Sequence, residues 1–152
     1  MPILNYTTKI VADKTAGEVL NILAKAGVQT ATVMYENFQP SGISFSFMVQ
    51  TSLLNFQLPL RWRGVLKVLE RQKGVPYSAR NEAQARRVAW RIIKDLVAAQ
   101  LAFVQSGQAE IPELFLPFVV NEEGRTLGDL VRDQPERLLP MANQYLLAEG
   151  KG

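Results

Sequence analysis

The middle of the chain alternates apolar and polar residues at a period of two, and this alternation constrains the fold more than any other feature. It is clearest in the stretch 43–50 and recurs in the stretches 30–36 and 54–60. A period of two places all the apolar side chains on one face of a strand. We therefore expect an antiparallel meander that packs on one side only.

The residues before this meander predict one further strand and one helix. β-Branched and aromatic side chains dominate residues 5–11, which favours a strand. Thr15 and Glu18 have the spacing of a capping box, in which a hydroxyl caps a helix and a carboxylate three residues on caps it in return. Gly27 is expected to end this helix, and residues 37–42, which include a proline and a glycine, are expected to form a turn.

After Pro59 the apolar spacing becomes helical. Proline cannot donate a ladder hydrogen bond, so Pro59 marks the end of the last strand. A short helix follows, and Trp62, at the head of its apolar stripe, is expected to lie in the core. A long helix is expected from a cap at Asn81 to about Gln105. Its predicted core face consists of Ala85, Val88, Ile92, Leu96, Ala99 and Phe103.

These elements predict an α+β fold. We expect an antiparallel three- to four-stranded meander covered on one face by helices, in the order β-α-β-β-β-α-α, followed by short C-terminal helices at 126–132 and 136–148. The apolar segment 114–120 is expected to pack as a strand or an extended arm. At 152 residues the chain fits a single domain, 1–152, with residues 108–152 as a C-terminal extension packed on the core.

The sequence contains neither cysteine nor histidine. A thiol nucleophile, a disulfide and imidazole-based proton transfer are therefore excluded. No glycine-rich phosphate loop is present. The adjacent Glu122 and Glu123 fall in a predicted turn, where their side chains diverge. We therefore expect that the protein is not an enzyme and has neither a cofactor nor a metal site. No apolar run approaches the length of a bilayer span, and residues 1–5 show no signal-peptide pattern. We therefore expect a cytoplasmic protein that does not contact a membrane.

Positive charge is concentrated in one stretch of the chain, residues 61–94, which we call the basic block. The basic block holds ten lysines and arginines against two glutamates, a net charge of +8. Residues 1–60 are neutral, and residues 95–152 carry a net charge of −5. Such a concentration favours a negatively charged partner.

Helical spacing gathers the cations of the basic block on two faces. One face consists of Arg63, Lys67 and Arg71, and the other of Arg87, Arg91 and Lys94. Trp90 lies four residues from Arg86 and from Lys94, so we predict that Trp90, or else Phe38, offers a ring on which a base stacks. Cations that neutralise phosphates beside such a ring are typical of nucleic-acid binding.

We therefore predict an accessory protein that binds nucleic acid, with single-stranded DNA favoured. The predicted binding residues are Arg61, Arg63, Lys67, Arg71, Arg86, Arg87, Trp90, Arg91 and Lys94. Self-association is expected to lengthen the binding site and add avidity.

Three other interpretations of these residues stay open. The two cationic faces are equally compatible with plain solvated helix surfaces, with Trp90 in the core. The acidic C-terminal third is a second candidate, because it could pair with the basic block. A protein-interaction module with an acidic protein partner, such as a host-factor inhibitor or an assembly component, is the third.

A further candidate surface is the polar sheet face formed by Ser44, Ser46, Gln50, Asn55 and Gln57, beside Thr30 and Thr32.

Several stretches of the chain also carry a resemblance to known sequences. They are Asn5–Lys9, Phe56–Pro59, Ala85–Asp95, Ala99–Gln100 and Leu114–Pro117. Across residues 3–133 the chain resembles a family of small uncharacterised proteins of bacteriophages and mobile elements, which implies a host-cell cytoplasm and no catalytic role. The element order is also similar to that of double-stranded-RNA-binding domains, whose basic motif is missing here, and to the core of phage single-strand annealing proteins, which are longer.

Overall fold

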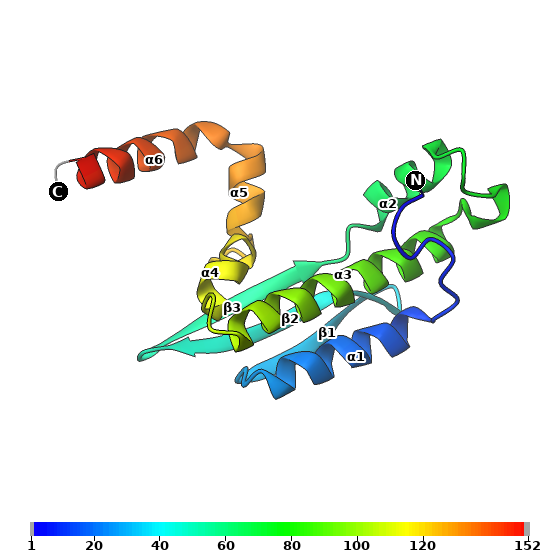
Figure 1. The fold of residues 1–152 in the computed structure, drawn as a ribbon, viewed down its shortest axis with the longest axis horizontal. Helices are drawn as coiled ribbons and strands as arrows, with labels where there is room; N and C mark the ends of the chain where they lie inside the picture. The colour runs from blue at the N-terminus through cyan, green and yellow to red at the C-terminus, as the bar shows by residue number, and fades with distance from the viewer. Residues whose placement is uncertain (1, 151–152) are drawn as a thin grey trace.

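The computed structural model describes residues 2–150 and confirms the α+β class. A three-stranded antiparallel sheet, in the order β1-β2-β3, forms one layer, and two long helices pack against it (Figure 1). The strands are β1 (Thr30–Glu36), β2 (Gln39–Val49) and β3 (Ser52–Pro59). The helices are α1 (Ala12–Lys25), α2 (Trp62–Arg71), η1 (Tyr77–Ala79), α3 (Glu82–Gln105), α4 (Ile111–Phe115), η2 (Leu116–Phe118), α5 (Leu127–Asp133) and α6 (Pro135–Gly150).

The N-terminal segment 2–11 is an irregular arm, so the strand predicted at residues 5–11 is wrong. Its backbone groups bond to glutamine side chains instead of a neighbouring strand. The Gln84 side-chain amide donates to the carbonyl oxygens of Tyr6 and Thr8 at 2.8 and 2.9 Å, and the Ile3 amide donates to Gln72 Oε1 at 2.6 Å. The arm is thereby fixed across α2 and the start of α3.

Helix α1 begins four residues earlier than predicted, at Ala12, and the predicted capping box at Thr15 and Glu18 is wrong. Val11 occupies the cap position without a side-chain hydrogen bond. Thr15 is buried inside the helix, and its hydroxyl oxygen has no hydrogen-bond partner among the described residues. The predicted stop at Gly27 is confirmed, because Gly27 has a φ of +86°, the left-handed conformation that ends many helices.

The predicted meander is confirmed, but its turns are tighter than expected. Only Asn37 and Phe38 connect β1 to β2, and both have positive φ angles, as a two-residue hairpin turn requires. The predicted turn at residues 37–42 is therefore too long. At the other end of the sheet Gln50, predicted to lie in the strand, has a φ of 55° in the turn between β2 and β3.

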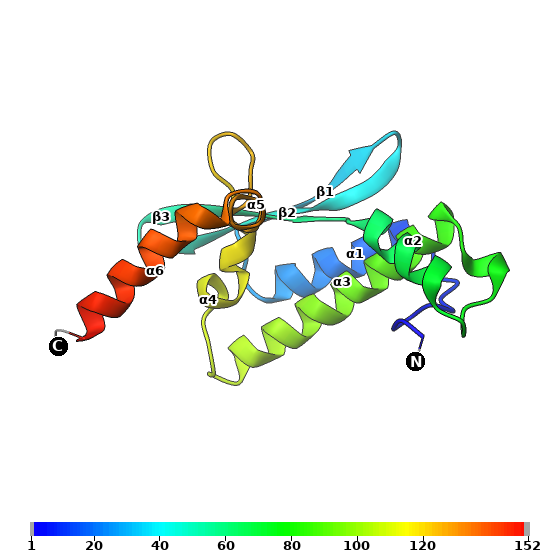
Figure 2. The ribbon, with the colours of Figure 1, turned by 90° about the horizontal axis from the view of Figure 1, so that it is seen from above.

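The core lies between one face of the sheet and helices α1 and α3 (Figure 2). Phe45 and Phe56, paired across β2 and β3, stack with ring centroids 5.0 Å apart, and Phe115 meets Phe45 edge-on at 5.4 Å. Aromatic contacts of this kind add to the free energy gained by burial. The sheet therefore joins α1, α4 and much of α3 in one main core, and a second, smaller cluster consists of Leu69, Val75 and Ala85.

Helix α3 presents a different stripe to this core than the sequence predicted. Ala85 and Val88 are buried as expected, but Leu96 and Phe103 are about 40% exposed. Trp90 is fully buried instead, and its indole Nε1 donates to the Pro40 carbonyl at 3.2 Å. The indole thus determines which face of α3 meets the sheet.

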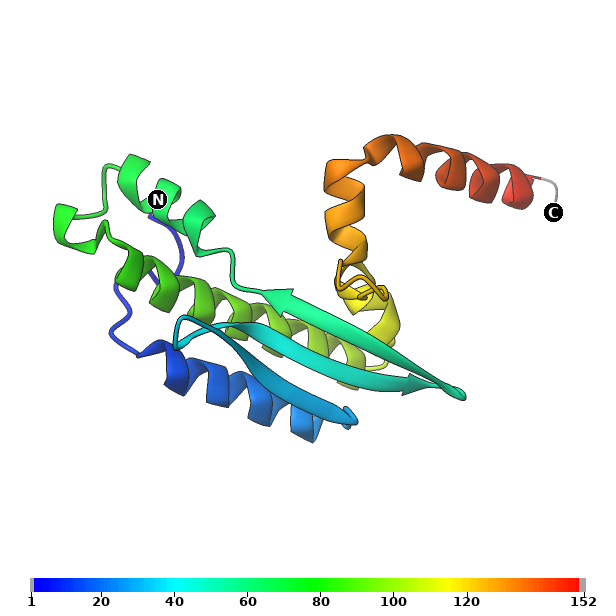
Figure 3. The same ribbon diagram turned by 180° about the vertical axis from the view of Figure 1, so that it is seen from behind.

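The C-terminal extension packs on the core only in its first part. Ile111 and Phe115 of α4 are buried, and Val119 bridges to Phe56 as a minimal fourth strand, so a short helix replaces much of the arm predicted at residues 114–120. Helices α5 and α6 confirm the two short C-terminal helices, and α6 projects away from the body (Figures 1 and 3). Between residues 2 and 150, none of the helices is long and apolar enough to cross a bilayer.

Replacing Gln84 should loosen the N-terminal arm. Leucine has a similar size but cannot make the hydrogen bonds to Tyr6 and Thr8, so Gln84→Leu should lower the free energy of unfolding by about 1–3 kcal/mol. Gln105→Leu, at the exposed end of the same helix, should change it by less than about 0.5 kcal/mol. Urea unfolding followed by circular dichroism measures both values. Equal stabilities for the two variants would contradict this role of Gln84.

Candidate nucleic-acid interface

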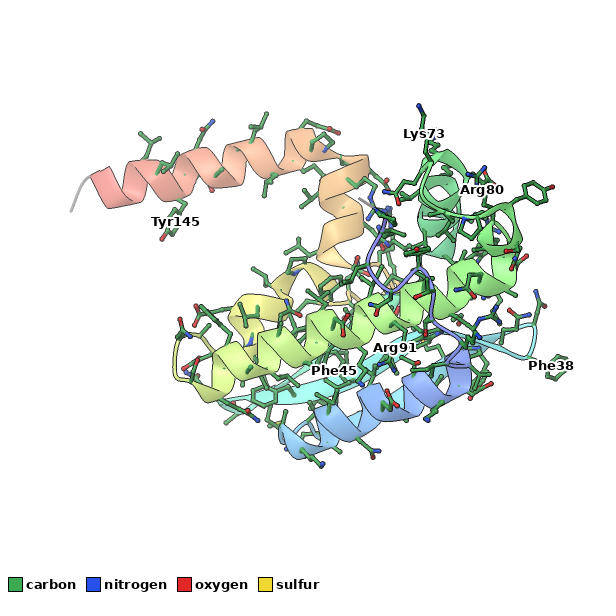
Figure 4. All side chains as sticks on the ribbon, turned by 45° about the vertical axis from the view of Figure 1, so that its right-hand side comes forward. Phe38, Phe45, Lys73, Arg80, Arg91 and Tyr145 are labelled. Carbon is green, nitrogen blue, oxygen red and sulfur yellow. The ribbon has the colours of Figure 1, made fainter. Side chains whose placement is uncertain are left out.

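Helix α2 turns its predicted cationic face to solvent. Leu69 is buried on the opposite side of the helix, while Arg63, Lys67 and Arg71 are exposed. Lys73, just beyond the end of the helix, is also exposed and extends outward (Figure 4). Within residues 2–150 no ion pair neutralises any of these four side chains. Their charge is therefore available to a partner.

Two guanidinium groups lie over the ring of Trp62 at the start of this helix. The Arg63 and Arg86 Cζ atoms are 4.9 and 4.7 Å from the ring centroid, so both groups make cation–π contacts. Trp62 itself is half-buried and packs against the core, as predicted. Arg86 also pairs with Glu82, one turn earlier on α3, at 3.0 Å. The indole therefore holds a cation from α3 beside those of α2.

The second predicted face, on α3, is part of the contact with α1. Arg91 and Lys94 both reach Glu18 Oε2, at 2.7 and 3.0 Å (Figure 4 labels Arg91 between the two helices). Arg87 Nε donates to the Gln84 side chain at 2.9 Å. Arg91 and Lys94 thus stabilise the α1–α3 contact, whereas Arg87 is bonded within its own helix and lines a surface depression with Phe38 and Arg86.

The two cations beside Glu18 lower the pKa of its carboxyl group. The hydrogen bond from Lys94 contributes most, and the hydrogen bond from Arg91 and the charges of both cations act in the same direction. Partial burial opposes them by favouring the neutral acid. Because the net effect is a lowered pKa of Glu18, its ionised form is stabilised more in the folded protein than in the unfolded chain.

Trp90 and Arg61 are placed differently from the prediction. Trp90 is buried, so the prediction that it offers a stacking ring is wrong, and the alternative that places it in the core is right. Arg61 pairs with Asp129 of α5 at 2.9 Å. In the part of the chain that the structure describes, this is the one ion pair between the basic block and the acidic C-terminal third. That third therefore leaves α2 uncovered.

Two exposed aromatic rings lie at the same end of the molecule as the cations of α2. Phe38, at the tip of the β1–β2 hairpin, is fully exposed and extends from the body (Figure 4). Phe38 and Arg86 line the same surface depression. Tyr77, in η1 between α2 and α3, is 88% exposed. The sequence prediction missed Tyr77, although an aromatic residue that follows a glycine and a proline in a loop has little chance of burial.

We call this surface the basic end. It consists of Arg63, Lys67, Arg71, Lys73 and Arg86 with the rings of Phe38 and Tyr77. The β1–β2 turn, α2 and the start of α3 all lie toward this end of the molecule (Figures 1 and 2). Cations and exposed rings thus occur at one end of the molecule. Phe38 is the alternative ring that the sequence offered, Tyr77 is an additional ring, and fewer of the predicted cations belong to this surface.

The polar sheet face lies on the side of the sheet away from α1 and α3. Thr30, Thr32 and Asn55 are exposed there. Ser46 is buried, and its hydroxyl is 2.6 Å from the Thr30 hydroxyl, so this pair satisfies itself. No residue of this face belongs to the basic end.

Comparisons of the chain with protein-family models, curated proteins and solved structures find no match. The resemblance to phage and mobile-element proteins therefore stays a prediction. Among residues 2–150 there is also no cluster of three or more acidic side chains that could hold a metal ion.

Removing the Glu18 carboxylate should destabilise the α1–α3 contact in a pH-dependent manner. At pH 7 Glu18→Gln should lower the free energy of unfolding by about 0.5–1 kcal/mol, because Arg91 and Lys94 lose their partner. The folded-state pKa of Glu18 lies below its ordinary value of 4.5. The difference between wild type and variant should therefore be constant above pH 4.5 and disappear as the pH falls through the lowered pKa.

Urea unfolding between pH 3 and pH 7 measures this difference. Glu122→Gln, in an exposed turn, is the control and should have little effect at any pH. A Glu18→Gln effect that persisted undiminished at pH 3 would contradict the assignment to the ion pairs.

Proposed function

We propose that the protein binds single-stranded nucleic acid, preferably DNA, at the basic end. The observation that carries this proposal is the presence of four unpaired cations of α2 and its C-terminal loop at the same end of the molecule as two exposed aromatic rings (Figure 4). Each cation that contacts a phosphate releases condensed counterions, which favours binding. Each ring offers a face on which an unpaired base stacks.

Single strands fit this surface better than duplexes do. Exposed rings such as Phe38 and Tyr77 gain stacking contacts only from bases that are not already stacked and paired. A duplex offers its phosphates to the cations but hides the faces of its bases. The rings therefore discriminate in favour of single strands, while the cations give affinity for both.

The backbone at Phe38 supports a functional role for its ring. Phe38 has a φ of 63°, a left-handed conformation that glycine adopts easily and that costs other residues about 1 kcal/mol. The side chain gains nothing from burial in return, because it is fully exposed. A residue that is unfavourable in both respects points to a contact with a partner.

A protein-interaction module is the second candidate function. The contact between Arg61 and Asp129 shows that a cation of the basic block already binds a carboxylate within this chain. An acidic protein could use the cations of α2 in the same way, and the exposed rings would then anchor the interface. Capture from a host lysate treated with nuclease separates the two functions, since only a protein partner survives the nuclease.

Reversing two charges of α2 should abolish most of the binding. The wild type should bind a fluorescent oligothymidylate with an affinity that falls with salt at a log–log slope of about −3, for four phosphate contacts. Lys67→Glu/Arg71→Glu should weaken the affinity roughly tenfold or more and reduce the slope by about 1.4. Fluorescence anisotropy at several salt concentrations measures both quantities.

The matched control is Lys14→Glu/Lys25→Glu on α1, which changes the net charge by the same amount. It should keep most of the affinity, because both lysines lie outside the basic end. Equal losses in the two double variants would show that net charge alone drives binding, and the basic end would lose its role. Salt-independent binding would also contradict the proposal.

Replacing Phe38 by glycine should stabilise the fold and weaken binding at the same time. Glycine adopts the positive φ of this turn position without strain, so the free energy of unfolding should rise by about 1 kcal/mol. Loss of the ring should cost about 1–3 kcal/mol of binding to a single strand. Gln50→Gly, in the turn at the other end of the sheet, is the control: it should also gain stability but bind normally. Unchanged binding by Phe38→Gly would remove Phe38 from the site.

A further inference from the structure

An apolar groove crosses the molecule between α2 and the C-terminal extension. It has a volume of about 430 Å³ and lies beside the basic end without including its rings. Its walls come from α2 and α5, and its floor from α3, the end of β3 and η2. Its lining is mostly aliphatic, with Leu58, Val65, Ile92, Ile93, Leu96 and Phe118 as its main side chains. Apolar surface gathered in this way is typical of a protein contact.

Helix α6 has the complementary property, an apolar face without a covering layer. Leu139 and Leu146 are 64% and 67% exposed and lie seven residues apart, so they share one side of the helix. Leu138 is also exposed at 43%. Pro140 removes one backbone hydrogen bond from this 16-residue helix. Isolated helices of this length are marginal in water, so α6 needs a surface on which its apolar face is buried.

The groove of the same chain is out of reach for α6. Helix α5 forms one wall of the groove, and α6 begins at Pro135, directly after α5 and one linking residue. From there α6 runs away from the side of α5 that faces α2 (Figures 1 and 3). The groove and α6 are both apolar, but α6 cannot fold back onto the groove of its own chain. They can therefore bind each other only when they belong to two different copies of the chain.

The contact area also fits a stable pair of chains. A helix of 16 residues is about 24 Å long and about 10 Å wide, so burying half of its surface removes about 380 Å² from water. The groove takes up leucine side chains of this face and the surface around it covers the rest, so two such helices and the two surfaces that receive them would bury about 1,500 Å² together. Stable protein interfaces bury about 1,200–2,000 Å².

We propose that the chain forms a two-fold symmetric dimer in which α6 of each copy lies in the groove of the other. The exchange is reciprocal, so both apolar faces are covered and the assembly closes at two copies. Two basic ends in one dimer would give the proposed nucleic-acid site its avidity. The dimer itself rests on the groove and α6 alone, and it stands whether or not the basic end binds nucleic acid.

Analytical ultracentrifugation of the full chain tests the dimer directly, in the absence of any nucleic acid. The wild type should sediment as a dimer at micromolar concentrations. An α6 variant, Leu139→Glu/Leu146→Glu, and a groove variant, Leu96→Glu, should each raise the dimer dissociation constant at least tenfold. Leu53→Glu, at an exposed leucine of β3 outside the groove, is the control and should remain a dimer. Circular dichroism confirms that each variant is folded.

Mixing the two weakened variants identifies what occupies the groove. The α6 variant keeps an intact groove and the groove variant keeps an intact α6, so a one-to-one mixture should form dimers with one native contact. Such complementation is expected only if α6 binds the groove of the other copy. A monomeric wild type, a groove variant that still forms dimers through α6 alone, or a mixture that stays monomeric would each overturn the proposal.

Discussion

The burial of Trp90 is the contact on which the rest of the structure depends. Its indole is the largest fully buried side chain, and its nitrogen donates to the carbonyl of Pro40, near the start of β2. An unpaired indole N–H in the core would be costly, so this bond fixes the rotation of α3 against the sheet. It also fixes the hairpin that ends at Phe38 relative to the start of α3. The basic end is assembled around this junction.

Once α3 is fixed in this orientation, the basic block divides into two parts with different roles. The cations at Arg91 and Lys94 meet Glu18 and hold α1 against α3. The cations of α2 have no carboxylate opposite them among the described residues, because α2 packs only its apolar side on the body. The same residue types thus serve stability on one helix and remain available for binding on the other. Local charge density alone does not distinguish these roles.

Sequence patterns predicted the elements whose signals are local. The three strands follow from a period of two, and α3 begins directly after Asn81, whose side chain caps the helix by accepting from the Gln84 amide. The conformation of the N-terminal arm could not be predicted, since it depends on hydrogen bonds from the Gln84 side chain, more than 70 residues away in the chain. The predicted rotation of α3 about its axis was wrong for a similar reason. Its sequence offers two overlapping apolar stripes, and the Trp90 contact with Pro40 selects between them.

The sequence predicted the cations of the candidate site better than its rings. The difference shows which residues are placed where they do not stabilise the fold. The larger aromatic candidate, Trp90, is buried in the core, while Phe38 is exposed and has a backbone conformation that glycine would adopt more easily. A chain selected for stability alone would place neither Phe38 in such a turn nor a row of leucines on an uncovered α6. These two departures lie in different parts of the molecule and share no residues. We therefore propose a separate partner for each: a strand with unstacked bases for the ring of Phe38, and a second copy of the chain for α6.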